Sequence, residues 1–269
     1  MPAEAERHYP AGHVLYRRLK RRYPRIVRGE GCWLYDDSGN RYLDASSGAL
    51  VSNLGHGNAE LAKALGEQAA RLSYVSGMFF THDPVEDLAA ELAGLTAPSL
   101  DKTMFMCNGG DAVEAALKIS RQFWSESGRP EKHRIVALAP SYHGNTLLAL
   151  SASARPSYRE LFGDWLVGVE TAPAPYAYHC PCRGDAEDCP TCDGSAVEAA
   201  ILRAGPENVA AFIGEPAMGA GRERQRVLHV PGHREVVQPG SRPVRDHCVL
   251  SDVQHCGPLV APPSAGRAR

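Results

Sequence analysis

Two consecutive glycines, Gly109 and Gly110, follow a short apolar segment and directly precede a helical pattern that begins at Asp111. Because glycine lacks a Cβ atom, the backbone at such a point can approach a ligand closely. The first amide groups of the helix, and the positive end of its dipole, then face that ligand. These residues form a candidate site for an anionic group such as a phosphate. Glycines also occur at strand-to-helix turns that bind nothing, so the pair needs support from other motifs.

Two further polar motifs follow predicted strands. Tyr142 and His143 come after one strand, and Glu215 comes after a later one. The carboxyl ends of parallel strands lie along one edge of a sheet, where ligands bind, so the three motifs are expected to converge. There Tyr142 could stack on a planar aromatic ligand, and Glu215 could hold an arginine or a polar network. Each residue also has an ordinary interpretation: a core aromatic for Tyr142, packing for His143 and a surface acid for Glu215.

The elements that would position these motifs follow from hydrophobic spacing and turn residues. Aromatic and aliphatic residues on both sides of a Ser-Gly-Asn turn predict a β-hairpin across residues 31–44. Apolar residues at helical spacing predict helices after Asn58 and from Asp83. Strands and helices then alternate, which predicts an α/β fold with a mostly parallel sheet between helices. The expected elements are strand 103–107, a helix from Asp111, strand 134–139, a helix after Gly144, helix 196–203 and strand 209–213.

Composition favours a globular protein that acts on small molecules. The chain has 269 residues, of which 43% are hydrophobic, enough for one large domain or two modest ones. Its net charge of −2 gives no field of one sign that would attract nucleic acid or an anionic membrane. The N-terminus lacks the apolar run of a signal peptide, and no stretch approaches the roughly 18 apolar residues of a membrane span. We therefore expect a cytoplasmic protein without nucleic-acid or membrane partners.

Together the motifs resemble the class III, or omega, aminotransferases, a branch of the fold-type I enzymes that depend on pyridoxal 5'-phosphate. The resemblance covers roughly residues 22–221, and it includes the hairpin, the 44–48 stretch, the Gly-His-Gly triplet at 55–57 and the three strand-end motifs. It implies a large cofactor domain with a mostly parallel sheet and an incomplete small domain. The expected division is an N-terminal segment of the small domain at 1–56, the cofactor domain at 57–221 and a tail at 222–269.

The resemblance also implies roles for individual residues. The two glycines would contact the cofactor phosphate, Tyr142 would lie against the pyridine ring, and Glu215 would be the acid near the cofactor. Ser47 and Gly48 would line the substrate side. The family commonly has Ser or Thr where Gly110 stands, so one hydroxyl donor is lost, worth roughly 1 kcal/mol. The implied cofactor-binding residues in this part of the chain are Gly109, Gly110, Asp111, Tyr142, His143 and Glu215.

Two residues that the family's chemistry requires are altered or missing. An aspartate pairs with the pyridine nitrogen, and a lysine forms the Schiff base with the cofactor and then moves the proton. Asp252 is the candidate aspartate, in a segment that lacks the glutamate of the family's motif. No lysine is a candidate, because all five, the last of which is Lys132, lie far before the expected position. The chain is therefore expected to be truncated and inactive.

The implied lineage is a transaminase that moves an amino group from an amine or amino acid donor to a 2-oxo acid acceptor. Family members are homodimers with active sites at the subunit interface. Two other interpretations stay open. The chain could be a non-catalytic remnant or a binding partner of an intact subunit, which the missing lysine favours. It could also be a lyase or racemase of the same fold, because those enzymes share the phosphate cradle, the ring-stacking residue and the aspartate.

The sequence changes character after about Gly221. Residues 218–269 contain no lysine, are rich in proline, glycine and histidine, and show no helical periodicity. A loop-rich tail would look like this, and so would a shifted reading frame or an abnormal splice. Disorder is expected in either case.

A cluster of four cysteines needs a separate interpretation. Four thiolates within a short segment suit tetrahedral zinc. However, paired ligands in zinc ribbons are usually both spaced by two residues, and similar enzymes carry a cysteine-bearing loop here without metal. A zinc site and a metal-free surface loop both stay open, with the loop favoured. The candidate ligands are Cys180, Cys182, Cys189 and Cys192.

Overall fold

The computed structural model describes residues 12–16, 23–175 and 194–216. The chain divides into two compact units, Met1–His82 and Asp83–Arg269. The predicted domain boundaries after residues 56 and 221 stay predictions. In the part of the chain that is described, no helix is both long and apolar enough to cross a membrane. The cytoplasmic location stays a prediction.

The first unit is built on the predicted hairpin, and its sheet has the strand order β1-β2-β3. β2 and β3 pair antiparallel around the predicted turn, where the Asp36 carboxylate accepts a hydrogen bond from the Asn40 amide at 2.8 Å. β1, which the sequence pattern does not reveal, pairs antiparallel with β2. The strands are β1 (Ile26–Glu30), β2 (Trp33–Asp36) and β3 (Arg41–Leu43).

Two helical segments follow in the first unit, α1 (Ser47–Leu50) and α2 (Ala59–Arg71). α2 is the helix predicted after Asn58. The Asn58 side chain caps it by accepting a hydrogen bond from the Leu61 amide at 2.9 Å. α1 is a single turn that the sequence pattern does not predict.

The second unit has a three-stranded parallel sheet in its described part, which confirms the predicted α/β class. The strand order is β5-β4-β6, and β4 pairs in parallel with both neighbours. The strands are β4 (Arg134–Ala139), β5 (Glu170–Pro173) and β6 (Val209–Ile213). The helices are α3 (Asp83–Leu95), α4 (Gly109–Glu126), α5 (Leu147–Ala152), α6 (Pro156–Arg159), the 3-10 helix η2 (Glu160–Trp165) and α7 (Ser195–Ala204).

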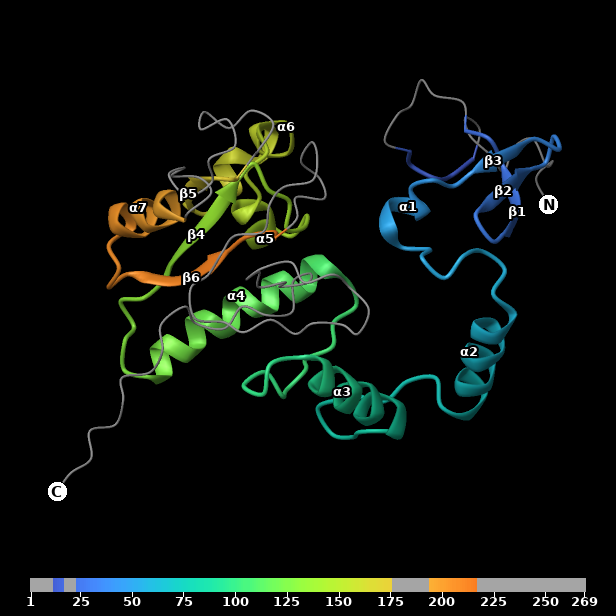
Figure 1. Ribbon diagram of the computed structural model, residues 1–269, viewed down its shortest axis with the longest axis horizontal. Coiled ribbons are helices and arrows are strands. Elements are labelled where there is room, and N and C mark those ends of the chain that lie inside the picture. The colour runs from blue at the N-terminus through green and yellow to red at the C-terminus, as the bar shows by residue number, and fades with distance from the viewer. Residues whose placement is uncertain (1–11, 17–22, 176–193, 217–269) are drawn as a thin grey trace, which may run out of the picture. The chain divides into compact units, whose positions relative to one another are not determined.

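Helices cover both faces of this parallel sheet, as Figure 1 shows for α4 and α7. One face packs against α4 and α5, in a cluster that includes Val113, Ala137 and Ala149. The other face packs against α7, in a cluster that includes Leu138 and Ala200. Successive residues of a strand point to opposite faces, so β4 contributes to both clusters and is buried through its middle.

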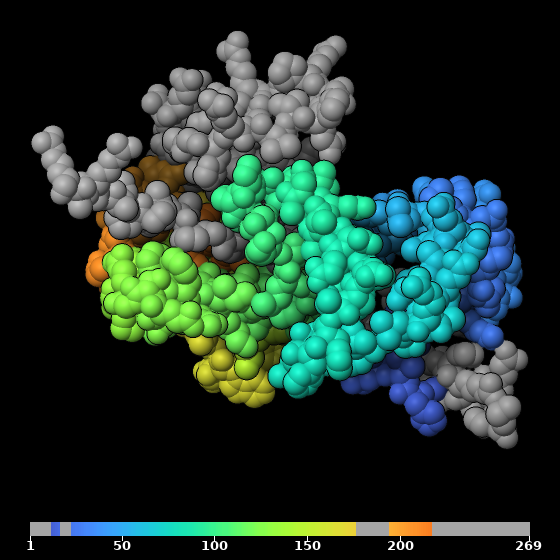
Figure 2. Space-filling view, turned by 90° about the horizontal axis from the view of Figure 1, so that it is seen from below, coloured from blue at the N-terminus to red at the C-terminus, as the bar shows by residue number. Residues whose placement is uncertain are grey.

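The predicted strand at residues 103–107 is wrong. None of the described strands pairs with this segment, and Met104 within it is 60% exposed. A strand needs a neighbour for its N–H and C=O groups, whereas an apolar run indicates only that some partner covers it. The helix that follows this segment, α4, begins at Gly109 rather than at the predicted Asp111, because Asn108 caps it. Figure 2 shows α4, in green, with its outer side in view.

Candidate cofactor site

The carboxyl ends of β4 and β6 lie side by side, because the two strands pair in parallel. Tyr142 follows β4 and Glu215 follows β6. The backbone N–H of Tyr142 donates a hydrogen bond to Glu215 Oε1 at 2.7 Å. Tyr142 is 42% exposed and meets Tyr158 edge-on, with 5.8 Å between the ring centroids. Tyr142 is therefore not a core aromatic, and Glu215 braces the loop that carries it.

The first turn of α4 supplies unpaired amides. Asn108 caps the helix: its Oδ1 accepts from the Asp111 amide at 3.0 Å, and its Nδ2 donates to Asp111 Oδ2 at 2.7 Å. The Asp111 carboxylate is thus engaged in the cap. Within the described part of the chain, the amides of Gly109 and Gly110 have no hydrogen-bond partner. Such amides at a helix start are suited to an anion.

Gly110 and Gly144 are in close contact. A Cβ atom on Gly144, whose φ is +134°, would lie 2.7 Å from the Gly110 Cα, closer than real Cβ atoms come to a neighbour. A Cβ on Gly110 would lie 3.2 Å from Asn108 Oδ1 and 3.6 Å from Thr146 Cγ2, whereas a Cβ on Gly109 would meet no atom within 4 Å. The backbone is therefore packed closely at Gly110 and open at Gly109. This arrangement fits the phosphate group of pyridoxal 5'-phosphate.

His143 is buried beside this loop. Its backbone N–H donates to Ser153 Oγ at 2.8 Å, and its ring Nε2 is buried without a partner among the residues that the structure describes. Burial lowers the pKa of His143 to about 4, so the imidazole is neutral at ordinary pH. This ring nitrogen is one hydrogen-bonding group at the site that is still to be satisfied.

Glu114 joins the site although the sequence motifs do not single it out. Its Oε2 accepts a hydrogen bond from Thr146 Oγ1 at 2.6 Å and one from the Ala149 amide at 3.3 Å. Glu114 is on α4, and the two donors belong to the start of α5. Glu114 could have been predicted from its spacing of four residues from Gly110, because residues four apart lie on one face of a helix.

The predicted substrate-side residues, Ser47 and Gly48, lie in α1, where the backbone is left-handed. The φ angles are +48° at Ser47, +60° at Gly48 and +66° at Ala49. The Gly48 amide donates to Asp44 Oδ1 at 3.2 Å, and Asp44 Oδ2 lies 3.0 Å from His56 Nε2. The hydrogen bond from His56 is the largest of several contacts that lower the pKa of Asp44. The role of this turn toward a substrate stays a prediction.

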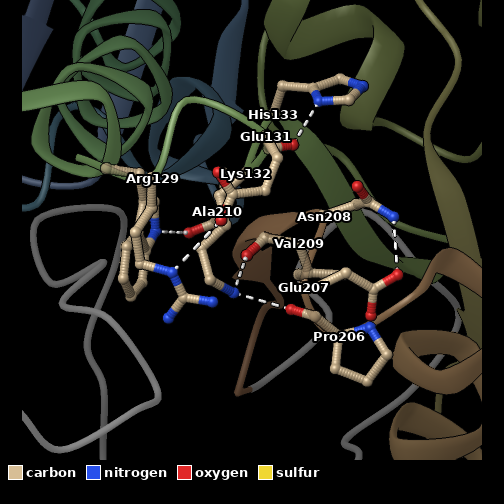
Figure 3. A network of polar contacts seen from close by, with 10 residues as sticks. Arg129, Glu131, Lys132, His133, Pro206, Glu207, Asn208, Val209 and Ala210 are labelled. Carbon is tan, nitrogen blue, oxygen red and sulfur yellow. Dashed lines mark hydrogen bonds and ion pairs between the residues drawn. The ribbon is translucent and has the colours of Figure 1, made fainter. Parts of the chain in front are cut away.

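Lys132 lies at the opposite edge of the parallel sheet, just before β4. Its ammonium group donates to the carbonyl oxygens of Pro206 at 2.7 Å and Val209 at 3.0 Å, as Figure 3 shows. Nζ also lies 4.7 Å from the centre of the Trp124 ring. Burial, and then the charge of Arg129, lowers the pKa of Lys132. The 6 residues of β4 span about 20 Å, so this lysine is remote from the glycines.

The remaining predicted site residues lie outside the described residues, and their roles stay predictions. For residues 12–16, 23–175 and 194–216, no group of three or more His, Cys, Asp or Glu side chains could hold a metal ion. The zinc prediction therefore stays open. These remaining residues are Asp252, Cys180, Cys182, Cys189 and Cys192.

The amino-acid sequence of this chain is similar to those of known aminotransferases. The family model for aminotransferase class III matches residues 17–224. The chain is 39% identical over 198 residues to an acetylornithine aminotransferase of Xanthomonas campestris pv. campestris, covering 73% of this chain and 43% of that protein. It is 35% identical over 207 residues to the mitochondrial gamma-aminobutyrate transaminase 1 of Oryza sativa subsp. indica, covering 73% of this chain and 39% of that protein. The chain thus spans about half the length, or less, of the curated relatives it matches.

A solved structure agrees with the fold. The (S)-enantioselective omega-transaminase from Thermomicrobium roseum superposes with a TM-score of 0.74 at 37% identity, covering 83% of this chain and 50% of that one. The family match confirms the predicted fold type, and pyridoxal 5'-phosphate is the cofactor of that family. The chain belongs to the class III aminotransferases.

Proposed function

We propose that the second unit is the cofactor-binding part of an aminotransferase that depends on pyridoxal 5'-phosphate. Its lineage would move an amino group from an amine or amino acid to a 2-oxo acid. The observation that carries the proposal is the grouping of the first turn of α4 with the two motifs that follow β4 and β6: Gly110 lies against Gly144, and the Tyr142 amide is bonded to Glu215. This edge combines a place for a phosphate, a half-exposed aromatic ring and an acid.

Each residue would act on the cofactor in a way that its surroundings support. The cofactor, when bound, supplies the electron sink for the amino carbon of the substrate. Gly109 and Gly110 would hold its phosphate through their free amides, and Tyr142 would pack on its ring. Glu215 would fix the position of Tyr142, and the neutral His143 would offer its buried Nε2 for one hydrogen bond. The proposed set is completed by Asp252, toward the ring nitrogen, and by Ser47 and Gly48 on the substrate side.

We also infer that this chain does not transaminate by itself. Catalysis in this family requires a lysine amine at the carbonyl carbon of the cofactor, both to bind it covalently and to move the proton. The sequence has five lysines. Lys132 is held by carbonyl groups at the opposite edge, and Lys118 is exposed on α4 about two turns beyond the glycines. Neither of these two lysines lies at the glycines, which supports the absence of turnover.

A homodimer, as in the family, is part of the proposal. Several large apolar side chains of the described residues are exposed, including Met78 at 85%, Phe79 at 75% and Trp165 at 69%. Phe79 lies in the first unit and Trp165 in the second, and apolar side chains exposed to this extent suit burial by a partner. The partner proposed is a second copy of the chain.

Titration of the purified chain with pyridoxal 5'-phosphate tests the proposal. The mixture is reduced with borohydride, its peptides are searched for modified lysine, and amino-group transfer to pyruvate is assayed in parallel. We expect saturable, reversible binding, low labelling scattered over the lysines and no turnover. Absence of saturable binding would contradict the cofactor role. Stoichiometric labelling of one lysine, with turnover above the free-cofactor background, would contradict the inference that the chain is inactive by itself.

A further inference from the structure

Glu114 links the two helices that begin at the candidate cofactor site. Its Oε2 accepts a hydrogen bond from Thr146 Oγ1 at 2.6 Å and a longer one from the Ala149 amide at 3.3 Å. Thr146 is the N-cap residue of α5, but its side chain makes no capping hydrogen bond within α5. The carboxylate of α4 therefore takes over the capping of α5.

This link lies next to the contact between the glycines. Gly110 and Glu114 are four residues apart, so they lie one above the other on one face of α4. A Cβ on Gly110 would lie 3.6 Å from Thr146 Cγ2 and 3.7 Å from the Asn145 amide nitrogen. The loop that Glu114 holds is thus the loop that borders the first turn of α4. A shift of this loop would therefore change the distance between the backbone of residues 144–146 and the backbone of Gly110.

We infer that Glu114 is a positioning residue, which acts through Thr146 to hold residues 144–146 against the first turn of α4 and so sets the width of the phosphate cradle. This inference rests on the proposed function. Glu114 does not contact the phosphate. Its negative charge is already satisfied by a hydroxyl and an amide at the start of α5, where a helix favours an anion. Loosening the link would weaken the binding of the phosphate group more than that of the ring.

The test compares two ligands that differ only in the phosphate, pyridoxamine 5'-phosphate and pyridoxamine. Neither carries an aldehyde, so neither forms Schiff bases with surface lysines. The quantity measured is the ratio of their dissociation constants, from equilibrium dialysis or ligand fluorescence. For the full wild-type chain we expect the phosphorylated ligand to bind more tightly.

Thr146 offers a matched pair of variants. Thr146→Val keeps the methyl group near Gly110 and removes the hydroxyl, whereas Thr146→Ser keeps the hydroxyl. We expect Thr146→Val to reduce the preference for the phosphorylated ligand roughly tenfold, as for one lost charge-assisted hydrogen bond, with the affinity for pyridoxamine unchanged. Thr146→Ser should restore the wild-type ratio. Glu114→Ala should act like Thr146→Val, and Glu114→Gln, which keeps an acceptor oxygen, should lose less.

Glu126→Ala is the control on the same helix, because Glu126 accepts a hydrogen bond from Gln122 at 2.7 Å far from the glycines. It should leave the ratio unchanged. If Glu114→Ala does not fold, the Thr146 pair carries the test alone. A Thr146→Val ratio equal to that of the wild type would overturn the positioning role while leaving the cofactor site in place. A wild-type chain with no preference for the phosphorylated ligand would instead refute the proposed function, and the cradle role with it.

Discussion

His143 makes the stability of the chain depend on pH in a defined direction. Burial lowers its pKa from 6.5 to about 4, so below pH 6.5 the unfolded chain binds a proton that the folded chain does not. Folding stability should therefore fall as the pH decreases from about 6.5 toward 4, by on the order of 2 kcal/mol at pH 5. Urea unfolding at pH 7.5 and pH 5 measures this loss.

Replacement of the imidazole provides the comparison. His143→Asn should lose less stability between the two pH values than the wild type does, since the asparagine does not titrate. His133 is exposed, and His133→Asn is the matched control with a wild-type pH dependence. If His143→Asn and the wild type lose the same free energy on acidification, the neutral buried state assigned to His143 is wrong.

Lys132 has a structural role in place of a catalytic one. It is 4% exposed, and its ammonium group satisfies the carbonyl oxygens of Pro206 and Val209. Lys132→Met would leave both acceptors without this donor and should lower the free energy of unfolding by about 3 kcal/mol. Lys118→Met, at an exposed lysine of α4, should change it by less than about 0.5 kcal/mol. Equal effects in denaturant melts would contradict the role of Lys132 as a link between β4 and β6.

The contact between α4 and the loop after β4 depends on two glycines. Gly144→Ala would place a Cβ 2.7 Å from the Gly110 Cα at a φ of +134°, so we expect a loss of at least about 2 kcal/mol in stability. Gly109→Ala meets no atom within 4 Å and should leave stability unchanged or raise it by up to about 1 kcal/mol. Chemical denaturation of both variants checks this pair. A Gly144→Ala variant as stable as the wild type would show that α4 can move away without cost.

The elements differ in how well the sequence predicts them. β4 and β6 have the predicted bounds, because both are apolar runs that end at a proline or a glycine, Pro140 and Gly214. β5 is missing from the prediction, since Glu170–Pro173 is short and ends in proline. The strand expected at 103–107 fails for the opposite reason: the apolar run is present, but no described strand pairs with it. Local pattern therefore predicts an element only where the chain also supplies its partner.

The site was predictable to the extent that its motifs follow strand ends. Tyr142 and Glu215 could be placed at one edge because parallel strands end together. The hydrogen bond between Thr146 and Glu114 could not be predicted, because it joins residues 32 positions apart and depends on how α4 packs against α5. The left-handed backbone of α1 also could not be predicted, because alanine and leucine, which stand at positions 49 and 50, rarely adopt positive φ angles.

The two units should differ in local stability. Every buried hydrophobic residue of the described chain belongs to the second unit, and α2 in the first unit has no buried residue. Hydrogen exchange should therefore be fast in α2 and slow in β4, whose middle is covered on both faces. Exchange measured by mass spectrometry on the full chain checks this. Equal protection of α2 and β4 would mean that a partner, such as a second subunit, covers α2.

The close packing at Gly110 couples the choice of residue at this position to the residue at 108. A Cβ at this position would lie 3.2 Å from Asn108 Oδ1, the atom that caps α4. The Asn108 side chain would have to move slightly to accept a serine at 110. The effect of that serine therefore depends on the capping residue at 108. The effect of Gly110→Ser should depend on which residue stands at 108, which is epistasis between two positions of one turn.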